Sequence, residues 1–202
     1  VLKSMGLRDA SIMKIFVIAG DISAEQYALQ YMQAIPNGPH EYKGIGGKLL
    51  RAHGLEITQD NTNLSVIGIV EVIKKFAFFK SVLKNTEENI LSWQPDLILM
   101  VDFPGFNLAL LKRISYLEIP VHYYIPPQLF AWGAARINLL VSSVAHVYYF
   151  YDFERKYLTH PKLQATQVTQ PKTEIIQPHT PVFPIKQIAL LPGSRQSELK
   201  TL

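Results

Sequence analysis

The 202-residue sequence contains no cysteine, so neither a disulfide framework nor a thiolate metal site can form. It also has no apolar run of the roughly 18 to 20 residues that a membrane-spanning helix needs. The 20 basic and 16 acidic residues give a net charge of only +4. This is too little to indicate a nucleic-acid partner, but it suits an anionic membrane face or a phosphorylated ligand. With 48% hydrophobic residues, the chain can bury a sizeable core.

Two phosphate-binding motifs are also missing. The loop AGDIS (19–23) lacks the G-x-G-x-x-G pattern of dinucleotide-binding proteins, and LLPGSR (190–195) lacks the Walker spacing. We therefore expect no nicotinamide, flavin or other cofactor, and no metal. Arg8 and Asp9 interrupt the N-terminus, which does not resemble a signal peptide. The chain begins without Met and ends at Leu202 just after a strand-turn-helix pattern, so we expect a fragment.

Short apolar runs alternate with helical patterns along most of the chain. Strands are expected at 14–19, 42–45, 55–58, 97–101, 121–125 and 147–150, and helices at 24–35, 46–54, 69–93, 108–117, 136–143 and 153–158. The strand patterns are mostly apolar rather than alternating, which favours a parallel sheet with helices on both faces, a Rossmann-like α/β fold. Ser23, with Gln26 three residues later, predicts a capping box at the start of the first helix.

The periodicity stops near residue 160. Residues 161–187 are rich in Pro, Thr, Gln and Lys, which predicts a linker or an exposed loop. A strand pattern then resumes at Ile188. We therefore expect one domain over 12–160, a linker over 161–187 and the start of a second domain over 188–202.

Asp102 is the leading catalytic candidate, because it ends the wholly apolar strand 97–101. In parallel α/β sheets, ligands gather at the carboxyl ends of the strands. A carboxylate at the edge of an apolar cleft has a raised pKa and can act as a general base. The alternative is that Asp102 only caps the helix that follows. His122, on the strand 121–125, has the position of a core histidine and is given no catalytic role.

Four other loops carry candidate ligand contacts. AGDIS enters a helix N-terminus, where backbone N–H groups suit an anionic or hydroxyl-rich ligand. GIGG (44–47) is explained equally by a tight turn and by ligand contact. The aromatic and proline-rich segment 123–132 suits stacking on sugars or acyl chains, or plain packing. Gly193, Ser194 and Arg195 form a turn before a helix, which suits a phosphate.

The stretch 66–84 combines apolar side chains with Lys74, Lys75, Lys80 and Lys84. Such a helix can lie in a bilayer interface. An ordinary core-packing helix with a solvated lysine face is the alternative. In the membrane interpretation, the side chains that face the bilayer are Val70, Ile73, Phe76, Phe79 and Leu83.

Six segments together resemble the lipid-A-disaccharide synthases, inverting glycosyltransferases of bacterial outer-membrane lipid biosynthesis. They are AGDIS (19–23), GIGG (44–47), VIGIVEVI (66–73), PDLILMVDFPGFN (95–107), HYYIPPQLFAWGAAR (122–136) and IALLPGSRQSE (188–198). The match runs from about Lys14 to Leu158 and resumes at Ile188.

The resemblance implies two Rossmann-like domains facing across a cleft, with the acceptor side in the N-terminal one. It implies transfer from UDP-2,3-diacylglucosamine to 2,3-diacylglucosamine 1-phosphate, giving lipid A disaccharide 1-phosphate and UDP, in the cytoplasm at the inner membrane. These lipid substrates favour the membrane interpretation of 66–84. Asp102 would be the base that deprotonates the acceptor hydroxyl, and Pro104-Gly105 would bend the backbone clear of the sugar. The implied substrate-binding residues are Gly20, Asp21, Ser23, Asn107, Gln128, Trp132, Arg136, Ser194 and Arg195.

The sequence departs from the family pattern at several positions. Asp21 replaces a Glu, Ala24 replaces a Gly, Gly105 stands where a second acid is usual, and Gly133 stands where a basic residue is usual. Two alternatives therefore stay open: another sugar-nucleotide enzyme of the same two-domain plan, such as a 2-epimerase, or a degenerate or truncated non-catalytic paralogue.

Overall fold

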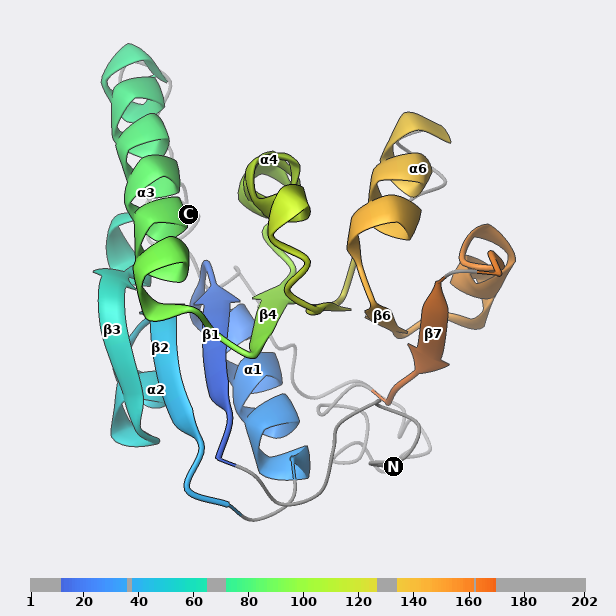
Figure 1. The fold of residues 1–202 in the computed structure, drawn as a ribbon, viewed down its shortest axis with the longest axis horizontal. Coiled ribbons are helices and arrows are strands. Elements are labelled where there is room, and N and C mark those ends of the chain that lie inside the picture. Colours follow the sequence, from blue (N-terminus) through green and yellow to red (C-terminus); the bar gives the residue numbers. More distant parts are fainter. Residues whose placement is uncertain (1–11, 36–37, 65–71, 127–133, 162, 170–202) are drawn as a thin grey trace, which may run out of the picture. The chain divides into compact units, whose positions relative to one another are not determined.

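Seven parallel strands form one sheet in the order β3-β2-β1-β4-β5-β6-β7 (Figure 1). The computed structural model describes residues 12–35, 38–64, 72–126, 134–161 and 163–169, which all belong to one compact unit, Val1–Gln170. The strands are β1 (Lys14–Ala19), β2 (Glu41–Gly46), β3 (Leu55–Asp60), β4 (Leu97–Val101), β5 (Val121–Tyr124), β6 (His146–Tyr149) and β7 (Gln164–Gln167). Each neighbouring pair is parallel, as the apolar strand patterns predict.

Helices cover both faces of this sheet (Figure 1). One face packs against α1 (Ile22–Ala34) and α2 (Lys48–Ala52); the other packs against α3 (Val72–Trp93), α4 (Pro104–Ile114) and α6 (Ala134–Ser143). Alternate residues of β1 serve the two faces, because side chains alternate along a strand. Phe16 packs with the α3–α4–α6 side, and Val17 packs with the α1–α2 side. The predicted Rossmann-like fold is therefore confirmed.

The strand order reverses between β1 and β4. From β1 the chain moves outward to β2 and β3, then returns across the sheet to pair β4 with the free side of β1. A crevice outside the carboxyl ends of the strands forms at such a reversal and is the usual ligand position in open α/β sheets. The loops after Ala19 and Val101 leave the sheet together at this point, because these two residues are paired.

The first helix does not begin as the sequence predicts. Asp21 is the N-cap of α1, and its side chain accepts a hydrogen bond from the Ala24 N–H at 2.8 Å. Ser23 lies inside the first turn and is exposed, so the predicted Ser23–Gln26 capping box is wrong. Both Asp and Ser are good N-caps. Asp21 is the N-cap because β1 ends at Ala19 and only Gly20 separates the strand from Asp21.

Two other boundaries differ from the sequence prediction. α4 begins at Pro104 rather than at 108, because Pro is well suited to the first helical position. β7 lies inside the segment 161–187, so the prediction of a linker or loop is wrong for residues 164–167. All four residues of β7 are exposed, and an exposed edge strand leaves no apolar pattern to find. The expected second domain, 188–202, lies outside the described residues.

Helix α3 contradicts part of the membrane prediction. Leu83 is only 6% exposed and belongs to the core, and Phe79 packs edge-on against the rings of Phe103 and Phe106. These two side chains do not face a bilayer, because residues four apart share one helix face and theirs is the face toward the sheet. Val70 lies outside the described residues, as do the side chains of Ile73 and Phe76.

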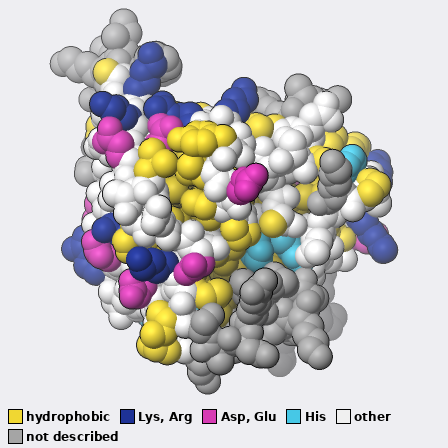
Figure 2. Space-filling model, in the orientation of Figure 1, with side chains coloured by type: hydrophobic (Ala, Val, Ile, Leu, Met, Phe, Trp, Pro, Cys, Tyr) yellow, Lys and Arg dark blue, Asp and Glu magenta, His cyan; other side chains and the backbone are white. Residues whose placement is uncertain are grey.

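The outward face of α3 carries the charges. Lys80 and Lys84 are exposed, and Lys84 pairs with Glu88 at 3.6 Å. Lys and Arg side chains gather over this helix (Figure 2). Over residues 77–93, α3 is thus a core-packing helix with a solvated lysine face. In the part of the chain that the structure describes, no helix is long and apolar enough to cross a membrane.

The burial of Leu83 predicts a large effect on stability. Leu83→Ala should lower the free energy of unfolding by about 2 to 5 kcal/mol, because it removes buried apolar surface and leaves a cavity. Lys84→Ala on the next residue is the matched control and should change stability by less than about 0.5 kcal/mol. Urea unfolding followed by circular dichroism measures both. Equal effects of the two substitutions would contradict the orientation of α3.

Candidate functional site

The loops after β1 and β4 are in direct contact. A side chain at Gly20 would place its first carbon 2.5 Å from the ring carbons of Phe103. Only glycine leaves room for that ring, so Gly20 has a packing role that locks the two loops together. The acidic residues that follow each strand, Asp21 and Asp102, are therefore brought to the same edge of the sheet.

The turn that carries Asp102 has an unfavourable backbone. Asp102 and Phe103 have φ values of 44° and 47°, in the left-handed region that L-residues disfavour. Two side chains hold this turn by donating hydrogen bonds to the Asp102 carbonyl oxygen: the Asn107 amide nitrogen at 2.6 Å and the Tyr123 hydroxyl at 3.0 Å. The Asp102 N–H donates to the Tyr124 carbonyl at 2.9 Å. The carboxylate is thus mounted on a rigid support.

These contacts correct two interpretations from the sequence. Asn107, implied as a substrate-binding residue, is fully buried and positions the Asp102 backbone instead. Gly105 does not bend the chain: it has no positive φ, and a side chain there would meet open space. The bend is made by Asp102 and Phe103, and Pro104 already begins α4.

Asp102 does not cap the helix that follows it. The N-cap of α4 is Phe103, and no side chain provides a capping hydrogen bond. Burial raises the pKa of Asp102 above its ordinary value, and the nearby Asp21 carboxylate raises it further; a hydrogen bond from the Phe103 backbone acts in the opposite direction. A half-buried carboxylate with a raised pKa, unused by the helix, has the properties of a general base.

The sequence prediction missed Tyr27, which lies near both Asp21 and Asp102. It lies on α1, and its ring packs against Tyr124 and Phe150 with centroid separations of 6.1 and 5.3 Å. Burial raises the pKa of Tyr27, with further contributions from Asp102, Tyr151 and Asp21. In the sequence Tyr27 is simply one member of the apolar face of a helix, so no local pattern distinguishes it.

The glycine cluster GIGG is explained by packing. Gly44 has a φ of 147°, and a side chain there would collide with the Val17 carbonyl oxygen. A side chain at Gly47 would meet the carboxylate of Glu25. Glu25 is buried and accepts hydrogen bonds from the Leu50 N–H at 3.1 Å and the Asn61 amide at 3.0 Å. This carboxylate from α1 thus accepts a hydrogen bond from a backbone N–H in the first turn of α2. Close packing in a tight turn therefore explains the glycine cluster.

The remaining predicted site residues fall into three groups. Ser23 is exposed in the first turn of α1, close to Asp21. Arg136 belongs to α6, but its side chain lies outside the described part of the structure. Gln128, Trp132, Ser194 and Arg195 lie outside the described residues altogether.

His122 lies in the core, as its strand position predicts. It is 3% exposed, and its Nδ1 is hydrogen-bonded to the Tyr31 hydroxyl. Burial, together with the neighbouring His146, lowers the pKa of His122 to about 3. A histidine that stays neutral and buried in this way stabilises the packing of α1 on the sheet.

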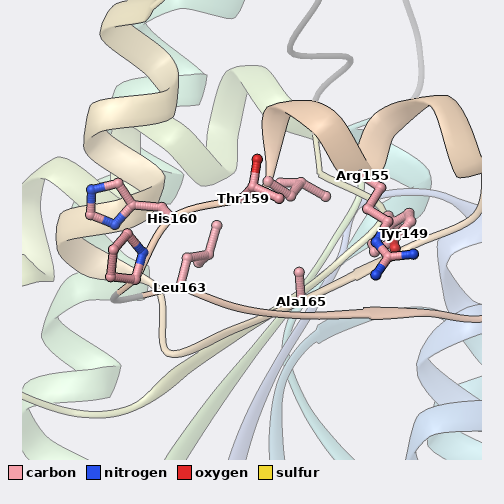
Figure 3. Close-up of a pocket in the computed structure, with 8 residues that line it drawn as sticks. Tyr149, Arg155, Thr159, His160, Leu163 and Ala165 are labelled. Atoms are coloured by element: carbon pink, nitrogen blue, oxygen red, sulfur yellow. The ribbon is translucent and has the colours of Figure 1, made fainter.

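A pocket of about 480 Å³ opens elsewhere, beside β6 and β7. Its lining comprises Tyr149, Arg155, Leu158, Thr159, His160, Pro161, Leu163 and Ala165. Arg155 lies beside Tyr149 at one end of it, and His160 lies at the other end (Figure 3). Because Arg155 and His160 do not converge and the pocket contains none of the predicted site residues, the edge that carries Asp102 is the better candidate site.

The raised pKa of Asp102 predicts an unusual effect on stability. A carboxyl group with a higher pKa in the folded state than in the unfolded state binds protons more tightly when folded, so its ionisation lowers stability as pH rises through that range. Asp102→Asn should therefore raise the urea midpoint at pH 7 and flatten its increase on acidification. Glu41→Gln, which changes an exposed acid at the start of β2, is the control and should change the midpoint little. A lower midpoint for Asp102→Asn would contradict the electrostatic argument.

Comparison with known protein families gives a match over most of the chain. The family model described as lipid-A-disaccharide synthetase matches residues 15–202. A lipid-A-disaccharide synthase of Persephonella marina is 35% identical over 203 residues, which is 94% of this chain and 52% of that protein. One from Coxiella burnetii is 29% identical over 205 residues, with 93% and 53% covered.

Among solved structures, the UDP-GlcNAc 2-epimerase of Neisseria meningitidis bound to UDP-GlcNAc has a TM-score of 0.47 and 13% identity, over 77% of this chain and 46% of that one. The chain spans about half the length of the curated relatives it matches. Since the family model covers almost all of the described residues, the chain belongs to the lipid-A-disaccharide synthetase family.

Proposed function

We propose that this chain provides the acceptor side of a glycosyltransferase that joins UDP-2,3-diacylglucosamine to 2,3-diacylglucosamine 1-phosphate. The observation that carries the proposal is Asp102: a carboxylate with a raised pKa, on a braced turn, where the order of a parallel sheet reverses. Membership of the lipid-A-disaccharide synthetase family supports this choice of substrates.

The proposed reaction is a single displacement with inversion. Asp102 accepts the proton of the acceptor hydroxyl while that oxygen attacks the anomeric carbon of the donor sugar. The bond from this carbon to the diphosphate breaks on the opposite face, and UDP leaves with the electron pair. A base works best when its pKa lies near the working pH, and burial together with Asp21 moves the pKa of Asp102 in that direction.

Other groups take supporting roles in this proposal. Gly20 and Ser23 lie at the N-terminus of α1, whose positive end favours an anionic or hydroxyl-bearing group. Gln128, Trp132 and Arg136 would contact the acceptor, and Arg195 beside Ser194 would neutralise charge on the departing diphosphate.

We also propose that the protein acts in the cytoplasm, peripherally at the inner membrane, because both substrates are lipids. Within the described residues, the basic face of α3, with Lys80 and Lys84, would attract anionic headgroups. The apolar contribution would come from the segment around Val70, Ile73 and Phe76, and not from Phe79 or Leu83.

Removing the base should abolish most turnover. In the full-length protein that contains this chain, Asp102→Asn should lower kcat by about 10² to 10⁴, because Asn keeps the size but cannot accept the proton. Glu41→Gln changes an exposed acid at the start of β2, at the opposite edge of the sheet; it should retain activity and serves as the control. Turnover is measured as UDP release from both lipid substrates in detergent. A folded Asp102→Asn variant with near-normal kcat would exclude the proposed role.

The 202-residue chain alone should form no disaccharide, because it spans about half the length of the related synthases. A transferase gains much of its rate by holding two substrates together, which requires both walls of the cleft. The same assay on the purified chain, with a UDP titration beside it, tests this expectation. Disaccharide product or tight saturable UDP binding would show a donor site within this chain.

A further inference from the structure

Two aromatic rings are stacked on the surface just after β6. Tyr151 and Phe153 have ring centroids 5.4 Å apart and planes within 12° of parallel. They are 49% and 50% exposed. Leaving two large rings half in water forgoes burial that normally stabilises a fold, so this pair is a candidate contact surface.

The stacked pair is connected to Asp102 through other aromatic side chains. The Tyr151 ring lies 6.5 Å from that of Phe150, and Phe150 lies 5.3 Å from Tyr27. Tyr27 is in turn within electrostatic reach of both Tyr151 and Asp102. The pair therefore belongs to the same edge of the sheet as the proposed base.

The sheet geometry gives the spacing between them. Asp102 follows β4 and Tyr151 follows soon after β6, and β5 is the one strand between these two. Because neighbouring strands are about 4.8 Å apart, the two strand ends are separated by about 10 Å. A single hexose ring with its substituents can bridge such a gap.

The backbone that carries the pair is held in place. The Glu154 carboxylate accepts a hydrogen bond from the Tyr151 N–H at 3.1 Å, and the Glu154 N–H donates to the Tyr151 carbonyl at 2.9 Å. These reciprocal bonds fix the start of the 3₁₀ helix η5 (Asp152–Tyr157). A surface that is already ordered loses little conformational entropy when a ligand binds.

We propose that Tyr151 and Phe153 form a platform on which the glucosamine ring of the acceptor stacks, with its reacting hydroxyl directed toward Asp102. Because the two rings are stacked on each other, the pair presents an outer ring face, and the C–H face of a pyranose can pack flat against such a face. The substrate class rests on the proposed function. Neither residue touches the reacting atoms, so both are positioning residues.

Binding by the 202-residue chain tests the platform without requiring turnover. Tyr151→Ala and Phe153→Ala should each weaken binding of 2,3-diacylglucosamine 1-phosphate in detergent micelles about 10-fold in isothermal titration calorimetry. Tyr151→Phe and Phe153→Tyr keep a flat ring and should bind normally. Tyr116→Ala removes an aromatic ring that is 65% exposed elsewhere and is the matched control. Unchanged binding by both alanine variants, with circular dichroism unaltered, would overturn the proposal.

Two further arms separate sugar from acyl recognition, and binding from chemistry. The loss of affinity caused by each alanine substitution should be equal for acceptors of different acyl length. Glucosamine 1-phosphate should compete with the lipid acceptor for the unsubstituted chain, and each alanine substitution should weaken the binding of this competitor as well. Weakening that grows with acyl length would assign the surface to acyl chains and overturn the sugar platform.

In the full-length protein, the alanine variants should raise KM for the acceptor with little change in kcat. Asp102→Asn should still bind the acceptor but should have a much lower kcat. The two measurements therefore distinguish a wrong assignment of the base from a wrong assignment of the platform.

Discussion

Two hydrogen bonds onto the backbone carbonyl of Asp102 support the candidate site. Asn107 and Tyr123 donate them from α4 and β5, and they offset the cost of two consecutive left-handed residues. The strained turn places the Phe103 ring over Gly20 and against the rings of Phe106 and Phe79. One turn therefore joins the β1 loop, β4, α4 and α3 into a single support for a carboxylate.

The electrostatics of this edge work against stability. Two half-buried carboxylates, Asp21 and Asp102, lie near each other, and a third ionisable group, Tyr27, is close to both. Such an arrangement raises the free energy of the folded state and is tolerated where reactivity requires it. By contrast, the buried carboxylate of Glu25 is fully used in hydrogen bonds to α2 and its neighbour Asn61, which is the pattern of a structural acid.

Most of the sheet can be predicted from the sequence because its strands are buried on both sides. Runs such as 15–19 and 97–101 consist of apolar residues, so their position and parallel pairing follow from composition alone. β7 could not be found in this way, since its four residues are exposed and polar or small. The start of α1 was missed for a different reason: Asp21 and Ser23 are equally good caps, and only the end of β1 selects between them.

The sequence by itself determined the α/β class, the order of elements and the presence of an acid after β4, because all three depend on residues close together in the chain. Tertiary structure decided what those residues do. Gly20 meets Phe103 across more than eighty positions, and Tyr27 lies near both Asp102 and Tyr151 only because β4 and β6 belong to one sheet, two strands apart. Leu83 faces the core and Asn107 faces a backbone carbonyl for the same reason. Side-chain direction depends on which surfaces meet after folding, and no local pattern records that choice.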